Sequence, residues 1–161
     1  MKPTTSKQFL QAAFIGALAG MRTTAAPVIA THILSIAPSG KLNTSRLKFM
    51  QSPTLAAIFK IVSVSELVVD KLPSTPNRIE TGGVAGRALS GALAGAAICK
   101  ASGINAWKGV AIGGLTAVAA TYASYFLRRE IVKRTGVADP FIGGIEDIAV
   151  IGAGVALCSN I

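Results

Sequence analysis

Ionisable side chains lie on one side of a predicted helix within the apolar run of residues 54–72. Lys60, Ser63, Glu66 and Asp70 follow one another at steps of three, three and four residues, which places them on one helical stripe. An ionised group in hydrocarbon costs about 2.5–3.5 kcal/mol on insertion scales, so this stripe is expected to face protein or water. The alternative is that Asp70, next to Lys71, already lies at the helix end, which leaves only Glu66 and Lys60 inside.

Two adjacent acids, Glu146 and Asp147, open the last apolar run of the chain. Acids in the first turn of a helix stabilise its N-terminus through the helix dipole. That role would suit Asp139 and Glu146, but it does not account for two consecutive acids before the segment IAVIGAGVAL. Both are therefore candidate binding residues.

Arg22 marks a predicted break in the first apolar run. Gly20 and Pro27 flank it, and Thr23 and Thr24 follow it directly. A helix broken inside a membrane exposes backbone hydrogen-bond donors, and transporters build solute sites from such breaks. We therefore expect the segment at Arg22 to contact a solute.

Arg128 ends the fourth apolar run and is a second arginine with a potential acidic partner. Either Arg22 or Arg128 could neutralise Glu66 or Glu146. The charged residues then form either buried ion pairs that order the bundle or a polar cavity for an ion or small solute. The residue types alone favour neither arrangement.

The composition is that of a membrane protein. Hydrophobic residues make up 51% of the 161 residues and charged residues only 14%, against roughly 25% in soluble domains. The apolar regions have the length of helices and lack the alternation of barrel strands. We predict one integral membrane domain over residues 1–161, an all-α polytopic helical bundle of five to six helices whose first helix is broken near Arg22. The five apolar regions are 8–37, 54–72, 84–101, 106–127 and 141–159.

The formal net charge of +9 comes mainly from basic residues in the gaps between apolar regions. This placement predicts contact with the lipid bilayer and with anionic lipid headgroups. No nucleic acid is expected as a partner, because the basic residues do not share one solvated face. The Lys and Arg distribution favours a cytoplasmic N-terminus if residues 8–37 cross once, and neither orientation if they turn back.

Glycines recur at four-residue spacing in three apolar regions, which favours close helix–helix packing. The motif GALAG occurs at residues 16–20 and again at 91–95, a pattern compatible with the internal inverted repeats of transporters. The glycine-rich faces would also suit a homo-oligomer. The spaced glycines are Gly16 and Gly20, Gly91 and Gly95, and Gly109 and Gly113.

Four motifs, GMRTTAAP, ELVVDKLPSTPNR, GRALSGALAG and TGVADPFIGGIEDIAV, resemble in this order a bacterial membrane-protein family called domain of unknown function 4126. The resemblance covers nearly the whole chain. It implies a small multi-pass protein of the bacterial cytoplasmic (inner) membrane, and it implies no particular activity. The family pattern corresponds here to Gly20, Arg22, Thr23 and Pro27, to Glu66, Asp70, Lys71, Pro73, Pro76 and Arg78, to Arg87, and to Glu146 and Asp147.

The leading hypothesis is a transporter or channel for a small solute or ion, and the alternative is a non-transporting scaffold that binds anionic lipid or a partner protein. An enzyme is not favoured, because the sequence lacks a nucleophile–base pair and a phosphate-binding loop. No cofactor is expected, and the lone His32 with the separated Cys99 and Cys158 gives no metal-binding pattern. The candidate binding residues are Arg22, Thr23, Thr24, Glu66, Asp70, Arg78, Arg87, Arg128, Glu146 and Asp147.

Overall fold

The computed structural model describes residues 5–69 and 79–159. The described residues form helices and contain no strand, as the all-α prediction required. Six of the helices are long, and two short ones fill the gap after the first apolar region. The elements are α1 (Thr5–Met21), α2 (Ala25–Ile36), α3 (Gly40–Asn43), the 3-10 helix η1 (Arg46–Gln51), α4 (Pro53–Val69), α5 (Thr81–Ala101), α6 (Ala106–Thr135) and α7 (Asp139–Ser159).

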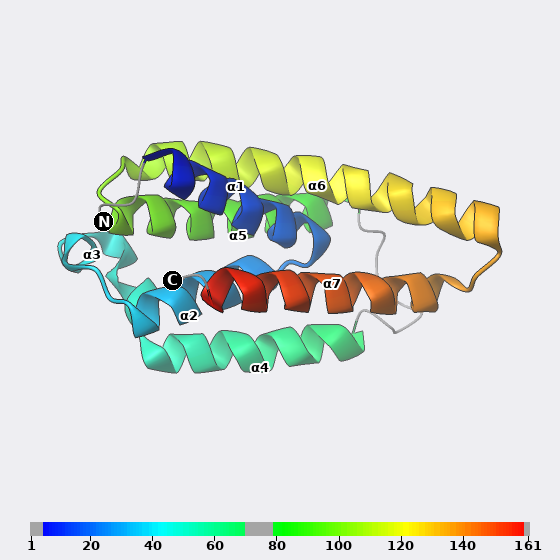
Figure 1. The fold of residues 1–161 in the computed structure, drawn as a ribbon, viewed down its shortest axis with the longest axis horizontal. Coiled ribbons are helices and arrows are strands. Elements are labelled where there is room, and N and C mark those ends of the chain that lie inside the picture. The colour runs from blue at the N-terminus through cyan, green and yellow to red at the C-terminus, as the bar shows by residue number, and fades with distance from the viewer. Residues whose placement is uncertain (1–4, 70–78, 160–161) are drawn as a thin grey trace.

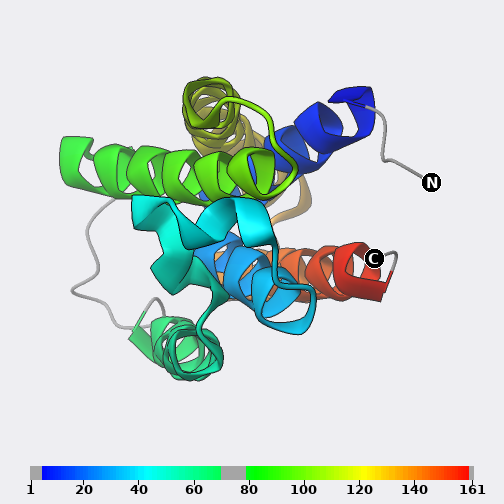
Figure 2. The same cartoon turned by 90° about the vertical axis from the view of Figure 1, so that its left-hand side faces the viewer.

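The long helices lie roughly along one axis, and the chain reverses direction from each to the next (Figure 1). α1 therefore begins, and α7 ends, at the same end of the bundle, which also carries α3. Figure 2 views the bundle from that end, with α5 and α6 on one side and α4 on the opposite side. Residues 8–37 do not form one span, because α2 runs back beside α1 after the break.

Three of the described helices, α5, α6 and α7, are long and apolar enough to cross a membrane. At about 1.5 Å per residue, α6 extends about 45 Å, whereas α2 extends only about 18 Å and cannot cross a hydrocarbon core of roughly 30 Å alone. Each candidate span presents a large apolar side chain outward: Leu89 is 71% exposed, Leu115 is 72% and Ile148 is 73%. Such surfaces suit lipid contact.

α1, α5 and α6 form the tightest part of the bundle, and glycine makes their approach close. Gly91 faces Gly113, and Gly95 faces Gly109, where α5 and α6 cross in opposite directions. A Cβ on any of these four would lie less than 3.0 Å from the carbonyl oxygen of the facing glycine. Gly16 on α1 packs against Gly113 as well. The predicted close packing therefore occurs within one chain.

A methyl group at this crossing is expected to destabilise the bundle. Gly113→Ala should lower the free energy of unfolding by about 1–3 kcal/mol, because the helices must separate to admit the side chain. Titration with SDS from mixed micelles measures this change. The matched control is Gly152→Ala on α7, where a Cβ would meet nothing within 4 Å. Equal stability of the two variants would contradict the close crossing.

Two helix boundaries differ from those expected. α6 continues past Leu127 to Thr135 and ends at Gly136, whose φ of 67° is the left-handed conformation that commonly terminates helices. α7 begins at Asp139, with the acid and Pro140 in its first turn, where both are favourable. The pair Glu146 and Asp147 consequently lies about two turns inside α7 rather than at its start.

Candidate functional site

The helix break at Arg22 is a short turn between α1 and α2. The backbone N–H of Arg22 still donates to the carbonyl of Leu18, at 2.8 Å, and the Arg22 carbonyl accepts from Ala25, at 3.1 Å. Thr23 and Thr24 lie between these bonds in a turn, and their backbone N–H groups donate to a side chain outside α1 and α2. The break predicted from the flanking Gly and Pro is therefore present.

Glu66, from α4, binds the free donors of this turn. Its two carboxylate oxygens accept hydrogen bonds from the backbone N–H groups of Thr23 and Thr24, each at 3.1 Å, and the Thr24 hydroxyl also donates to it. The carboxylate thus caps the N-terminus of α2, where a negative charge is stabilised by the helix dipole. No described lysine or arginine forms an ion pair with Glu66, so the expected neutralisation by an arginine does not occur there.

The other side of the break is fixed by α5 and α6. The hydroxyl of Ser90 on α5 donates to the Thr23 carbonyl. The hydroxyl of Thr121 on α6, which is fully buried, lies 3.2 Å from the carbonyl of Gly20. Polar groups from three separate helices therefore satisfy the backbone of the break, as a low-dielectric environment requires.

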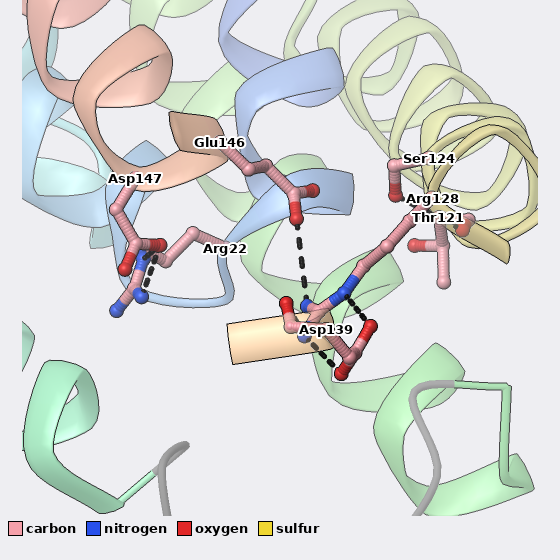
Figure 3. Close-up of polar contacts among 7 residues, drawn as sticks. All are labelled: Arg22, Thr121, Ser124, Arg128, Asp139, Glu146 and Asp147. Carbon is pink, nitrogen blue, oxygen red and sulfur yellow. Dashed lines mark hydrogen bonds and ion pairs between the residues drawn. The ribbon is translucent and has the colours of Figure 1, made fainter. Parts of the chain in front are cut away.

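Arg22 forms an ion pair with Asp147 across the bundle, as Figure 3 shows. The guanidinium Nε donates to the Asp147 Oδ1 at 3.1 Å, and a terminal nitrogen donates to the same oxygen. The Arg22 side chain is only 5% exposed and that of Asp147 is 14% exposed. The pair therefore connects the break to α7 inside the protein.

Arg128 forms a second polar cluster near the end of α6 (Figure 3). It donates to both carboxylate oxygens of Asp139, each at 2.6 Å, and its guanidinium lies 3.8 Å from Glu146. Gly143 provides the space for it, because a Cβ there would lie 3.1 Å from the Arg128 guanidinium. Neighbouring acids on α7 thus have different partners: Glu146 faces Arg128, whereas Asp147 faces Arg22.

The candidate residues consequently divide between two places. Arg22, Thr23, Thr24, Glu66 and Asp147 meet at the break, whereas Arg128 and Glu146 lie together in the second cluster. These described candidates therefore do not all meet at one site.

Arg87 is buried on α5, with 8% of its surface exposed. Asp70 and Arg78 lie outside the described residues. Ser90 and Asp139 were not predicted as site residues, although Asp139 was recognisable as an acid at the start of a helix.

A groove between α2, α4 and α7 reaches the break from the side. Its volume is about 320 Å³, and its wall includes Arg22, His32 and Lys60. Lys60 Nζ lies 3.2 Å from His32 Nδ1. Sequence reasoning had treated His32 as isolated, because nothing in the linear spacing connects it to Lys60. None of the described residues that line the groove is acidic.

The described residues contain no group of three or more His, Cys, Asp or Glu side chains that could hold a metal ion. The anionic oxygens found at the break are instead directed to backbone amides and to a guanidinium. This part of the site is therefore suited to holding helix ends together and to presenting a cationic wall to the groove.

The long apolar helices and the broken, internally capped α1–α2 segment define a small helical membrane protein. A model of the family described as domain of unknown function (DUF4126) matches residues 10–159. The chain belongs to this family, as its motifs had indicated. Searches of the curated proteins and of the solved structures each found no match.

Proposed function

We propose that this protein moves a small solute or ion across the bacterial cytoplasmic membrane, with the groove between α2, α4 and α7 as part of the path. The observation that carries the proposal is the meeting of this groove with a helix break at Arg22. Discontinuous helices with capped ends are the way in which secondary transporters place polar groups at membrane depth. The groove volume of about 320 Å³ is at the small end of ligand sites.

The contacts favour different roles for the acids and the basic residues. Glu66 and Asp147 are engaged by α2 and by Arg22, so they hold the walls of the path in place. Lys60 and His32 face the groove and are placed to contact the solute. A cation-binding or proton-relay role for the acids would first require these contacts to open.

Filling the groove is expected to block transport. In liposomes containing the purified protein, stopped-flow light scattering would follow osmotic entry of potassium acetate, potassium chloride, ammonium chloride and glycerol. We expect flux above empty liposomes for at least one solute, and at least a tenfold loss in Ser63→Trp, whose side chain would enter the groove. Val64→Trp is the matched control, because Val64 is 62% exposed and does not line the groove.

Two results would contradict the proposal. One is the absence of protein-dependent flux both for every solute in the panel and for a medium-chain carboxylate such as octanoate. The other is full flux in Ser63→Trp, which would show that solute does not pass along this groove.

The distribution of charged residues along the bundle supports a second candidate function, that of a non-transporting scaffold that binds anionic lipid. The end of the bundle at which α1 begins carries only basic side chains among its described charged residues, and every described acid lies towards the other end. An acid-free basic end suits anionic lipid headgroups. This function requires no solute flux, so the same liposome experiment separates the two. The basic residues are Lys7, Lys41, Arg46, Lys48, Lys100 and Lys108.

A homo-oligomer stays a prediction. Because the spaced glycines of α1, α5 and α6 are occupied within the chain, a second subunit would have to use other surfaces. The inverted repeat also stays a prediction: both GALAG segments pack near Gly113 on α6, one from α1 and one from α5.

A further inference from the structure

Lys60 is a cation in the middle of an apolar helix. It is the eighth residue of the 17-residue α4, about two turns from either end. Its side chain is exposed at the groove, and its ammonium lies 3.2 Å from Nδ1 of His32 on α2. A lysine in the middle of a lipid-embedded helix is costly unless a counter-charge or water accompanies it.

The described residues that line the groove supply no acid for this lysine. Of its two permanent cations, Arg22 is paired with Asp147, whereas no described acidic side chain forms an ion pair with Lys60. When the Lys60 ammonium donates to Nδ1 of His32, the neutral imidazole carries its proton on Nε2. The groove wall therefore offers an ammonium and a second N–H donor, with one uncompensated positive charge.

Apart from Ser63, the remaining described wall of the groove is apolar. Val28 and Ile29 from α2 and Val150, Ile151 and Val155 from α7 line it. A hydrophilic anion would leave these side chains without a partner, whereas an anion with a hydrocarbon tail would cover them. The groove volume of about 320 Å³ is at the small end of ligand sites, which suits a carboxylate with a short alkyl tail.

We infer that the groove binds a medium-chain carboxylate, with its head group at Lys60 and His32 and its alkyl tail between α2 and α7. The inference deepens the proposed function by naming the class of solute. A carboxylate fits better than a phosphate, because its single charge matches Lys60, the one cation among the described groove residues without an acidic partner, and its two oxygens match two donors. The ligand would supply the counter-charge that the groove lacks.

Equilibrium binding of radiolabelled octanoate to the protein in lipid nanodiscs tests the inference, with binding to empty nanodiscs subtracted. We expect saturable binding that falls at least tenfold in Lys60→Met and is retained in Lys60→Arg. Lys108→Met is the matched control, since it removes an exposed lysine near the start of α6, away from the groove. Unlabelled octanoate should compete, and octylammonium should not.

Equal octanoate binding by the wild type and Lys60→Met would overturn the inference. Competition by octanol as effective as that by octanoate would also overturn it, because it would indicate an apolar site that does not select for charge. Binding and flux are measured separately, so the two proposals can fail separately. Charge-selective binding without any flux would leave the site intact and refute transport. Flux that octanoate neither drives nor inhibits, with no octanoate binding, would refute only the assignment of the solute.

Discussion

Replacement of Arg22 by methionine is expected to lower the free energy of unfolding by about 3–5 kcal/mol, because it leaves the carboxylate of Asp147 buried without its partner. Asp147→Leu should also be destabilising, since the guanidinium then loses the carboxylate to which Nε and a terminal nitrogen donate. SDS-induced unfolding in mixed micelles, followed by far-ultraviolet circular dichroism, measures both. The double variant should be more stable than the sum of the single losses predicts.

The exposed pair on the same bundle provides the control for this experiment. Arg134 and Glu130 form an ion pair at 2.7 Å, but their side chains are 77% and 50% exposed. Arg134→Met should therefore change stability by less than about 1 kcal/mol. If Arg22→Met were equally mild, the pair at the break would be solvated and the buried site would be refuted.

Replacement of Glu66 by alanine should destabilise the protein by about 3 kcal/mol, because two backbone N–H groups and the Thr24 hydroxyl lose a charged acceptor. The stability of Glu66→Gln should lie between those of the wild type and Glu66→Ala, since the amide of Gln keeps one oxygen that can accept a hydrogen bond. Hydrogen exchange gives the more specific readout: the amides of Thr23 and Thr24 should exchange faster, while those of the α5–α6 crossing should change less.

Glu130→Ala serves as the control for loss of an acid elsewhere, because Glu130 is half-exposed on α6 and lies away from the break. Unchanged exchange at Thr23 and Thr24 in Glu66→Ala would show that the turn does not depend on α4. That result would refute the capping role of Glu66.

The sequence predicted the break and the helices better than it predicted the partners. Gly, Pro and Thr next to Arg22 mark a turn whatever surrounds it, because their effects on the backbone are local. Partner choice is not local. Glu146 and Asp147 are adjacent in sequence, yet residues one apart on a helix point about 100° apart, so they face α6 and the break respectively. Only the packing of α7 decides which arginine each acid meets.

The groove likewise shows that local spacing is visible in the sequence, whereas contacts between distant segments are not. The stripe Lys60–Ser63–Glu66 was visible from helical spacing, and its members do lie towards α2. His32 gave no signal, because its contact with Lys60 joins positions 28 residues apart and depends on α2 turning back beside α4. Likewise, the glycine spacing predicted close packing but could not tell neighbours in the same chain from neighbours in a second one.

The cap on α2 comes from a later segment of the same chain, and this has a consequence for the order of events during biosynthesis. The amides of Thr23 and Thr24 leave the ribosome some 42–43 residues before Glu66, and Arg22 precedes Asp147 by 125 residues. At roughly 5–20 residues per second, the turn waits a few seconds for its carboxylate and longer still for α7. Until then, the backbone donors of the turn need water or the translocon as hydrogen-bond partners. We therefore expect α1 and α2 to reach their final packing in lipid only after Glu66 has been synthesised. The ion pair between Arg22 and Asp147 forms last, when α7 is in place.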